Sequence, residues 1–120
     1  MNSTVVNIRK KELNKRGIKD FEEWQSGASN RIYIGRNMCA YVPGTNKSKW
    51  ANPYSTKGGN YSLTQSLELY EAHIRNSNLI NELTELDNAE LGCWCAPNPC
   101  HGNVLIKLRL EFSKKKHIIP

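Results

Sequence analysis

Three of the four cysteines lie in one twelve-residue stretch, LGCWCAPNPCHG, which spans positions 91–102. Structural zinc sites use four thiolate or imidazole ligands. The stretch supplies four such groups, on Cys93, Cys95, Cys100 and His101. A single residue separates the first two cysteines, which is fewer than zinc knuckles usually have. A zinc site is therefore one of three interpretations of this stretch.

A reactive thiol is the second interpretation. The proline-rich turn before Cys100 predicts that a helix begins there, and the N-terminus of a helix lowers the pKa of a thiol. A neighbouring imidazole can carry the proton, so Cys100 and His101 are the candidate catalytic residues. Cys95, at the end of a predicted strand, is a second candidate nucleophile. This interpretation predicts a cysteine-dependent enzyme that acts on a nucleotide.

The third interpretation is structural. On a strand, Cys93 and Cys95 project to one face and Trp94 to the other, and small apolar thiols pack well in a buried sheet. Cys100 and His101 then contribute to a ligand pocket without metal or covalent chemistry. The three interpretations stay open at the level of sequence, and no cofactor is expected apart from zinc in the first of them.

Short strands and helices alternate along the rest of the chain. Runs of β-branched and aromatic residues predict strands, and apolar residues that recur every three or four positions predict helices. The predicted strands are 4–10, 31–36 and 89–95, and the predicted helices are 18–27, 63–74, 79–86 and 101–112. Strands separated by helices favour a parallel sheet. We predict a small single-domain Rossmann-like α/β fold with a short, mainly parallel sheet over residues 1–112, and a basic tail at 113–120.

Parallel sheets bind ligands beyond the carboxyl ends of their strands. The predicted strands bring Arg9, Arg36 and the segment 96–102 to that edge. Guanidinium groups suit phosphate, and the free amides of a helix that begins near Gly102 favour an anion. Cys95 lies at the same edge. The sequence therefore predicts an anion-binding pocket at the strand ends.

A long polar segment, residues 37–61, follows the second of these arginines. It has neither helical nor strand periodicity, and such loops in a small domain are usually functional. In the predicted pocket, its lysine would hold phosphate, its tryptophan would stack on a base and its asparagine would bind a polar edge. The candidate ligand-binding residues of this segment are Ser48, Lys49, Trp50 and Asn52. Cys39, isolated in the same segment, is expected to be incidental.

The charge balance favours anionic partners. The chain has 17 Lys and Arg against 11 Asp and Glu, a formal net charge of +6. Such an excess suits a nucleotide or a nucleic acid. No apolar run is long enough for a membrane helix, and the first residues lack the apolar core of a secretory leader. We expect no membrane partner and a cytoplasmic location; the oligomeric state stays open.

Four motifs together carry a family resemblance. The strings VVNIRK, YIGR, SKWANPY and LGCWCAPNPCHGNVL, spread over residues 4–110, resemble the domain-of-unknown-function family 4326 of bacteriophages, bacteria and large DNA viruses. In that family a glycine usually stands at the place of Ala51 and an acidic residue at the place of Asn103. The resemblance implies a compact α/β fold and a viral or phage origin, with the host cytoplasm as the location.

Three functions are weighed on these grounds. The preferred one is a virus- or phage-type domain that binds a nucleotide or nucleotide-derived ligand at the strand ends, to modify it or to sequester a host nucleotide signal. The first alternative is a zinc-stabilised module that binds nucleic acid through its basic excess and tail. The second alternative is the cysteine-dependent enzyme. Whether the protein is an enzyme stays open.

Overall fold

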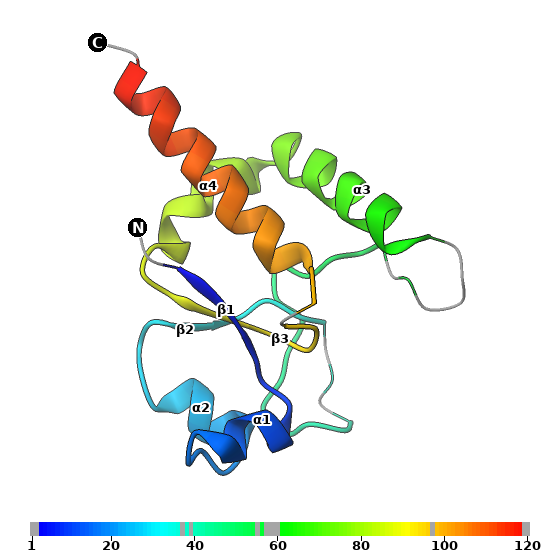
Figure 1. Ribbon diagram of the computed structural model, residues 1–120, viewed down its shortest axis with the longest axis vertical. Helices are drawn as coiled ribbons and strands as arrows, with labels where there is room; N and C mark the ends of the chain where they lie inside the picture. The colour runs from blue at the N-terminus through cyan, green and yellow to red at the C-terminus, as the bar shows by residue number, and fades with distance from the viewer. Residues whose placement is uncertain are drawn as a thin grey trace.

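Three short parallel strands form the centre of the molecule (Figure 1). The computed structural model describes residues 3–36, 38, 40–54, 56, 61–96 and 98–118, with side chains as far as residue 111. The strands are β1 (Thr4–Asn7), β2 (Arg31–Tyr33) and β3 (Glu90–Cys93). Their order is β1-β3-β2, so the last strand of the sequence is the central one. The predicted parallel sheet and the α/β class are confirmed.

The helices cover both faces of this sheet (Figure 1). On one side lie α1 (Lys10–Lys15) and α2 (Phe21–Ser26). On the other lie α3 (Leu63–Arg75), the 3-10 helix η2 (Asn78–Leu86) and α4 (His101–Ile118). None of the helices in the described part of the chain is long and apolar enough to cross a membrane.

Local signals set the helix boundaries. The Ser62 hydroxyl accepts from the Gln65 amide while the Gln65 side chain accepts from the Ser62 amide, a capping box that starts α3. The Asp20 carboxylate accepts from the Glu23 amide and starts α2. Gly17 follows α1 with a φ of 76°, a conformation that glycine adopts without steric cost.

Two elements differ from the sequence prediction. The helix α1 was not predicted, because its six residues bury only Leu13 and so show no apolar period. The helix α4 was predicted to end at residue 112, but its backbone continues to Ile118. The proposed tail, 113–120, therefore continues the helix through most of its length. The strands are shorter than predicted: pairing with β3 covers only the first residues of the runs 4–10 and 31–36, and β3 itself spans only Glu90–Cys93 of the run 89–95.

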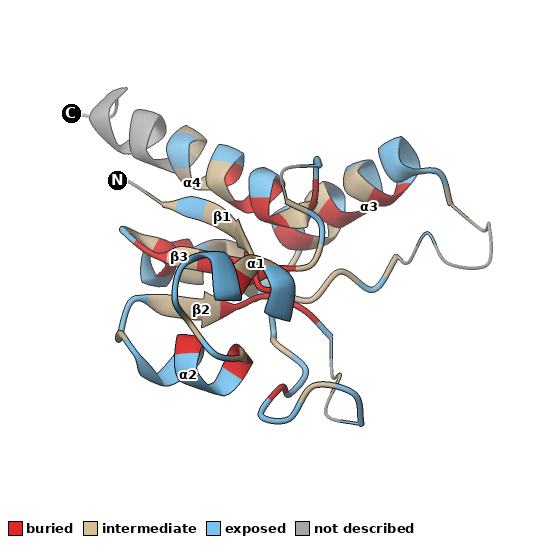
Figure 2. Ribbon diagram, turned by 60° about the horizontal axis from the view of Figure 1, so that its bottom comes forward, coloured by how far each residue is buried: buried red, intermediate tan, exposed pale blue. Residues whose placement is uncertain are grey.

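Two hydrophobic clusters lie on opposite faces of the sheet (Figure 2). The larger cluster joins β3, α3, η2 and α4, and the smaller joins α1, α2 and the end of β2. Gly92 in the central strand allows the smaller cluster to approach, because a Cβ there would lie 2.6 Å from the Trp24 ring. Buried residues therefore support the sheet from both sides.

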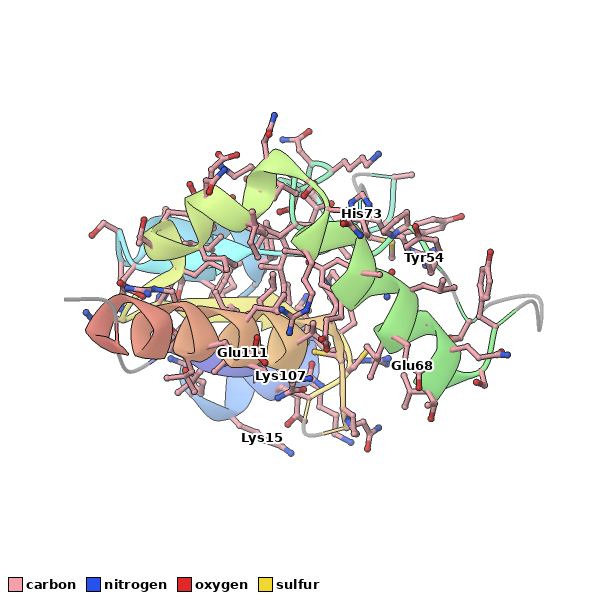
Figure 3. The ribbon with its side chains drawn as sticks, turned by 90° about the horizontal axis from the view of Figure 1, so that it is seen from above. Lys15, Tyr54, Glu68, His73, Lys107 and Glu111 are labelled. Atoms are coloured by element: carbon pink, nitrogen blue, oxygen red, sulfur yellow. The ribbon has the colours of Figure 1, made fainter. Side chains whose placement is uncertain are left out.

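The two long helices are also joined at their surface. Lys107 of α4 forms an ion pair with Glu71 of α3, and Glu111 of α4 pairs with Arg75 of α3. The helices lie side by side when the molecule is seen from above (Figure 3). Tyr54, in the loop before α3, packs edge-on against His73 (Figure 3). The two ion pairs join the middle of α4 to the C-terminal half of α3, and the ring contact joins the preceding loop to the same helix.

Candidate functional site

A pocket of about 450 Å³ opens at the carboxyl ends of β1 and β3. Its walls come from the residues after those strands, from the turn that leads into α4 and from the loop before α3. The lining residues are Asn7, Arg9, Thr56, Leu63, Trp94, Cys95, Ala96, Asn98 and Pro99. We call this the edge pocket. It lies at the edge where the sequence predicted a ligand site.

Arg9 is the cation of the edge pocket. It is exposed, and its backbone amide donates to the Asn7 carboxamide oxygen. Its Nε donates to the Trp94 carbonyl at 3.1 Å, which holds the side chain over the end of β3. Among the described residues, the two terminal nitrogens of the guanidinium have no hydrogen-bond partner and no carboxylate partner. The group is therefore positioned yet free to bind an anion.

Trp94 provides an aromatic surface beside this arginine. Its Nε1 donates to the Tyr33 hydroxyl at 3.1 Å, and that hydroxyl donates to the Arg36 carbonyl at 2.6 Å. The Tyr33 and Trp94 rings meet edge to face. Burial is the largest influence on the Tyr33 hydroxyl and raises its pKa. Trp94 is half-buried, so the network fixes its ring while part of it lines the pocket.

The turn after β3 is fixed by backbone contacts. The Asn7 side chain donates to the Ala96 carbonyl at 2.7 Å, and the Asn98 amide donates to the Cys95 carbonyl at 2.9 Å. Cys95 is exposed in the edge pocket, as predicted for its position. Burial of its sulfur raises the pKa of the Cys95 thiol, and Arg9 opposes this only in part. At neutral pH the thiol is therefore protonated, which makes it a poor nucleophile.

The other two cysteines of the stretch form a buried pair. The sulfur atoms of Cys93 and Cys100 are 3.3 Å apart, and both residues are almost fully buried. The hydrogen bond from Cys100 lowers the pKa of the Cys93 thiol, and the amides of Cys95 and Ala96 lower it further. The same contact raises the pKa of Cys100. The pair therefore favours one thiolate, on Cys93, with the Cys100 thiol as its donor.

The N-terminus of α4 differs from the sequence prediction. The Asn103 amide donates to the Cys100 carbonyl at 3.0 Å, and the Asn103 side chain accepts from the Cys100 amide at 2.9 Å. A Cβ on Gly102 would lie 2.9 Å from both Ile34 and Val5. Gly102 is therefore buried against the sheet and does not line the edge pocket; a phosphate contact at its amide stays a prediction.

His101 does not pair with the cysteine beside it. Its Nε2 lies 2.6 Å from the Ile34 carbonyl, and its ring packs edge-on against Tyr70. Burial lowers the pKa of His101, so the ring is neutral and donates to that carbonyl. In this arrangement His101 links the start of α4 to the end of β2. The predicted catalytic pair of Cys100 and His101 is not assembled.

The predicted zinc set is also not assembled. Within the described residues, no three Cys, His, Asp or Glu side chains come close enough to hold a metal. The set fails because Cys93 and Cys100 contact each other, Cys95 faces the edge pocket and the His101 ring bonds to a carbonyl. The zinc-stabilised nucleic-acid module therefore has no cluster of metal ligands to support it among the described residues, and it stays a prediction.

Three candidates from the long loop are engaged elsewhere. Lys49 forms ion pairs with Glu82 and Glu85 of η2, and their hydrogen bonds raise its pKa. Trp50 is only 1% exposed and belongs to the larger core cluster, so it offers no face to a ligand. The Asn52 side chain donates to the Ser66 hydroxyl and accepts from the Tyr54 amide. These residues anchor the loop to η2 and α3.

The last two candidates lie near the sheet edge but outside the edge pocket. Arg36 is exposed, and its carbonyl accepts from Tyr33. The Ser48 amide donates to the Gly35 carbonyl, and its hydroxyl accepts from the Trp50 amide. Ser48 lines a second pocket of about 310 Å³ beside β2. Cys39 lies outside the described residues.

Sequence reasoning missed four polar or aromatic residues of the edge pocket, of which Thr56 lies in the loop before α3. Asn7 is the last residue of β1, Trp94 directly follows β3, and Asn98 lies in the turn before α4. Only Asn98 lies just beyond a predicted strand, where ligands of parallel sheets bind; Asn7 and Trp94 fell inside predicted strands that were too long. Trp94 was instead assigned to the opposite face of a longer strand.

The family assignment rests on most of the chain. A family model described as a domain of unknown function, DUF4326, matches residues 15–111. The chain belongs to this family. Comparison with curated proteins gives no match, and comparison with solved structures gives none. The Rossmann-like character therefore stays a prediction, whereas the small α/β fold with a parallel sheet is observed.

Proposed function

We propose that this domain binds a nucleotide or nucleotide-derived ligand in the edge pocket. The observation that carries the proposal is Arg9, an exposed guanidinium held beside Trp94 at the carboxyl edge of a parallel sheet. A guanidinium with free terminal nitrogens binds phosphate through two parallel hydrogen bonds. An indole ring beside it offers a surface on which a base stacks. The pocket, about 450 Å³, has a volume typical of small-molecule sites.

The polar side chains of the edge pocket suit the remainder of such a ligand. Asn98 is exposed, and its carboxamide can both donate to and accept from a sugar or base edge. Leu63 adds an apolar side chain that is 46% exposed. The edge pocket thus offers a positive group for a phosphate and a flat ring for a base. Its amide and its apolar wall suit the ribose and the edge of the base.

Retention of the ligand is supported better than its chemical modification. The thiol that faces the edge pocket, on Cys95, has a raised pKa. The Cys100 sulfur and the His101 ring are engaged with Cys93 and Ile34, so neither is aimed at the pocket. A binding role, including capture of a host nucleotide signal by a virus- or phage-encoded protein in the host cytoplasm, fits these contacts.

The direct test is nucleotide binding by variants that differ by one positive charge. Purified protein is screened by thermal shift with mononucleotides and cyclic nucleotides, and the dissociation constant of any hit is measured by calorimetry. We expect a nucleotide to raise the melting temperature of the wild type. Arg9→Gln should weaken binding by about 10–100-fold, because it removes charge-assisted hydrogen bonds to phosphate.

Lys11→Gln is the matched control. Lys11 is exposed on α1, and the substitution removes the same charge without touching the edge pocket. Binding by this variant should fall by much less than that of Arg9→Gln, because Lys11 does not line the edge pocket and its replacement removes no direct hydrogen bond to the ligand. The proposal fails if no nucleotide raises the melting temperature at millimolar concentration. It also fails if the two variants bind equally well.

A further inference from the structure

We propose that Cys93 and Cys100 form an oxidisable dithiol site, which a small hydroperoxide converts into a disulfide between the end of β3 and the start of α4. The two sulfur atoms are already 3.3 Å apart, in a direct contact. Cys93 ends β3, and Cys100 immediately precedes α4. The inference does not depend on any ligand of the edge pocket.

The backbone brings the two sulfurs together from opposite ends of one turn. The Cys93 backbone is held by its pairing with β1, and the Cys100 amide donates to the Asn103 side chain at the start of α4. Each thiol thus projects from a fixed point of the backbone into the buried contact with the other. Because the sulfurs are in contact, rotation of the side chains brings them into bonding distance without a large shift of strand or helix.

The chemistry assigns a different role to each cysteine. Amides and the Cys100 thiol favour the thiolate at Cys93, which is the nucleophilic form. The Cys93 sulfur attacks one oxygen of the hydroperoxide, the O–O bond breaks, and a sulfenic acid forms with release of water or an alcohol. The Cys100 sulfur then attacks the sulfenic sulfur and displaces a second water. In total, two thiols are oxidised by two electrons and one hydroperoxide is reduced.

Burial selects the class of oxidant. Cys93 is 1% exposed and Cys100 is 2% exposed, whereas Cys95 between them is open to the edge pocket. A bulky disulfide reagent therefore meets Cys95 first and cannot form a mixed disulfide with either buried sulfur. Hydrogen peroxide is close to water in size and reaches buried sites during small fluctuations of the surrounding turn.

The disulfide would act on the segment that lines the edge pocket. Five of the lining residues lie between the two cysteines in the sequence: Trp94, Cys95, Ala96, Asn98 and Pro99. A bond between the ends of this segment limits its conformations more than the present contact does. The oxidation state of the buried cysteines would therefore change the conformational freedom of the segment that lines the edge pocket.

The test uses the full-length Cys95→Ser variant, which removes the exposed thiol that competes for the oxidant. The folded protein is treated with hydrogen peroxide, denatured, alkylated and digested with trypsin. The tryptic peptide 76–107 then contains only Cys93 and Cys100, while Cys39 falls in the separate peptide 37–47. We expect peptide 76–107 to lose the mass of two hydrogen atoms and to take up no alkylating reagent.

A second cleavage locates the bond. Chymotrypsin cuts after Trp94, so the two halves of the loop stay joined only if Cys93 and Cys100 are linked, and they separate on reduction. Adding Cys93→Ser or Cys100→Ser to the Cys95→Ser variant should abolish the link. A bulky aromatic disulfide should modify Cys95 of the folded wild type while leaving the buried pair unmodified.

Two results would overturn the inference. One is full alkylation of both cysteines in peptide 76–107 after peroxide treatment of the folded Cys95→Ser variant. The other is oxidation of a single cysteine to the sulfinic acid without a link to its neighbour, which would show that the second sulfur does not trap the sulfenic acid. Neither result bears on nucleotide binding, which is measured on reduced protein.

Discussion

Two regions of this molecule carry the same three kinds of side chain, a cation, a tryptophan and an asparagine, and use them in opposite ways. One region is the long loop after β2, and the other is the edge pocket. We call the two sets the loop trio and the edge trio. The loop trio is Lys49, Trp50 and Asn52, and the edge trio is Arg9, Trp94 and Asn98.

Every member of the loop trio has protein partners. Lys49 pairs with two glutamates of η2, and the Trp50 indole donates to one of them, Glu85, at 2.8 Å. Asn52 bonds to Ser66, which is almost fully buried in α3. The charge of Lys49 and the polar groups of Trp50 and Asn52 are therefore paired with other residues of the protein.

The edge trio leaves part of its binding capacity open. The Arg9 terminal nitrogens and the Asn98 carboxamide have no hydrogen-bond partner among the described residues, and Trp94 is only half-buried. The difference between the trios does not come from residue type. It comes from the neighbouring elements: η2 supplies glutamates to Lys49 and Trp50, and α3 supplies Ser66 to Asn52, whereas the described residues place no such partners beside the Arg9 terminal nitrogens and the Asn98 carboxamide.

The largest contrast should appear when the tryptophans are replaced. Trp50→Ala empties a site in the larger core cluster and also leaves the Glu85 hydrogen bond unmade. We expect it to lower the free energy of unfolding by about 3–5 kcal/mol. Trp94→Ala should cost about half as much, because part of that ring already faces the pocket. Urea unfolding followed by circular dichroism measures both values.

The contrast would collapse if Trp94→Ala cost as much stability as Trp50→Ala. That result would mean that Trp94 is a core residue whose exposed part plays no role in the pocket. If Trp50→Ala does not fold, Trp50→Phe and Trp94→Phe replace the two alanine variants, because phenylalanine keeps most of the volume. Trp50→Phe should then be the less stable of the two.

The fold could largely be predicted from the sequence, because its signals are local. Apolar spacing located α3 through Tyr70 and Ile74, both fully buried; Ser62 and Thr64 were both possible caps, and the structure places the cap at Ser62. β-Branched runs located β1 and β2. The helix α1 was missed because it is short and buries one residue, and local sequence does not show where α4 ends once it leaves the core.

The site could be predicted only in part, because partners distant in sequence decide which side chains stay free. The strand ends indicated the edge at which a pocket is observed, with Arg9 and Cys95 among its lining residues, and a ligand there stays a prediction. Lys49 appeared equally available until η2 brought Glu82 and Glu85 to it, more than thirty residues along the chain. A single sequence does not contain that pairing in a form that local patterns can show.

The asparagines should give a smaller contrast of the same sign. Asn52→Ala removes a donor from the Ser66 hydroxyl and an acceptor from the Tyr54 amide. We expect a loss of about 1–2 kcal/mol in unfolding free energy, since these polar groups lie beside buried α3. Asn98→Ala should change stability by less than about 0.5 kcal/mol, because its side chain is exposed.

Chemical unfolding of the two alanine variants measures this contrast directly. Equal costs at the two positions would contradict it, because they would mean that Asn98 has a structural role like that of Asn52. A nucleotide titration of both variants adds a second measure. Asn98→Ala should weaken the binding of any nucleotide that the wild type binds, and Asn52→Ala, where folded, should not.

The cations should give the smallest stability effects, and salt should separate them. Lys49 and both of its glutamate partners are more than 40% exposed, so Lys49→Gln should cost only about 0.2–1 kcal/mol. That cost should shrink in 1 M salt, where exposed ion pairs are screened. Arg9→Gln should be neutral or slightly stabilising, because it removes one positive charge from a chain of net charge +6 and breaks no ion pair among the described residues. Unfolding of both variants at low and high salt measures these effects. If Arg9→Gln loses as much unfolding free energy as Lys49→Gln, and loses it only at low salt, the guanidinium already has an anionic partner within the protein. The edge pocket would then have no free cation for a phosphate.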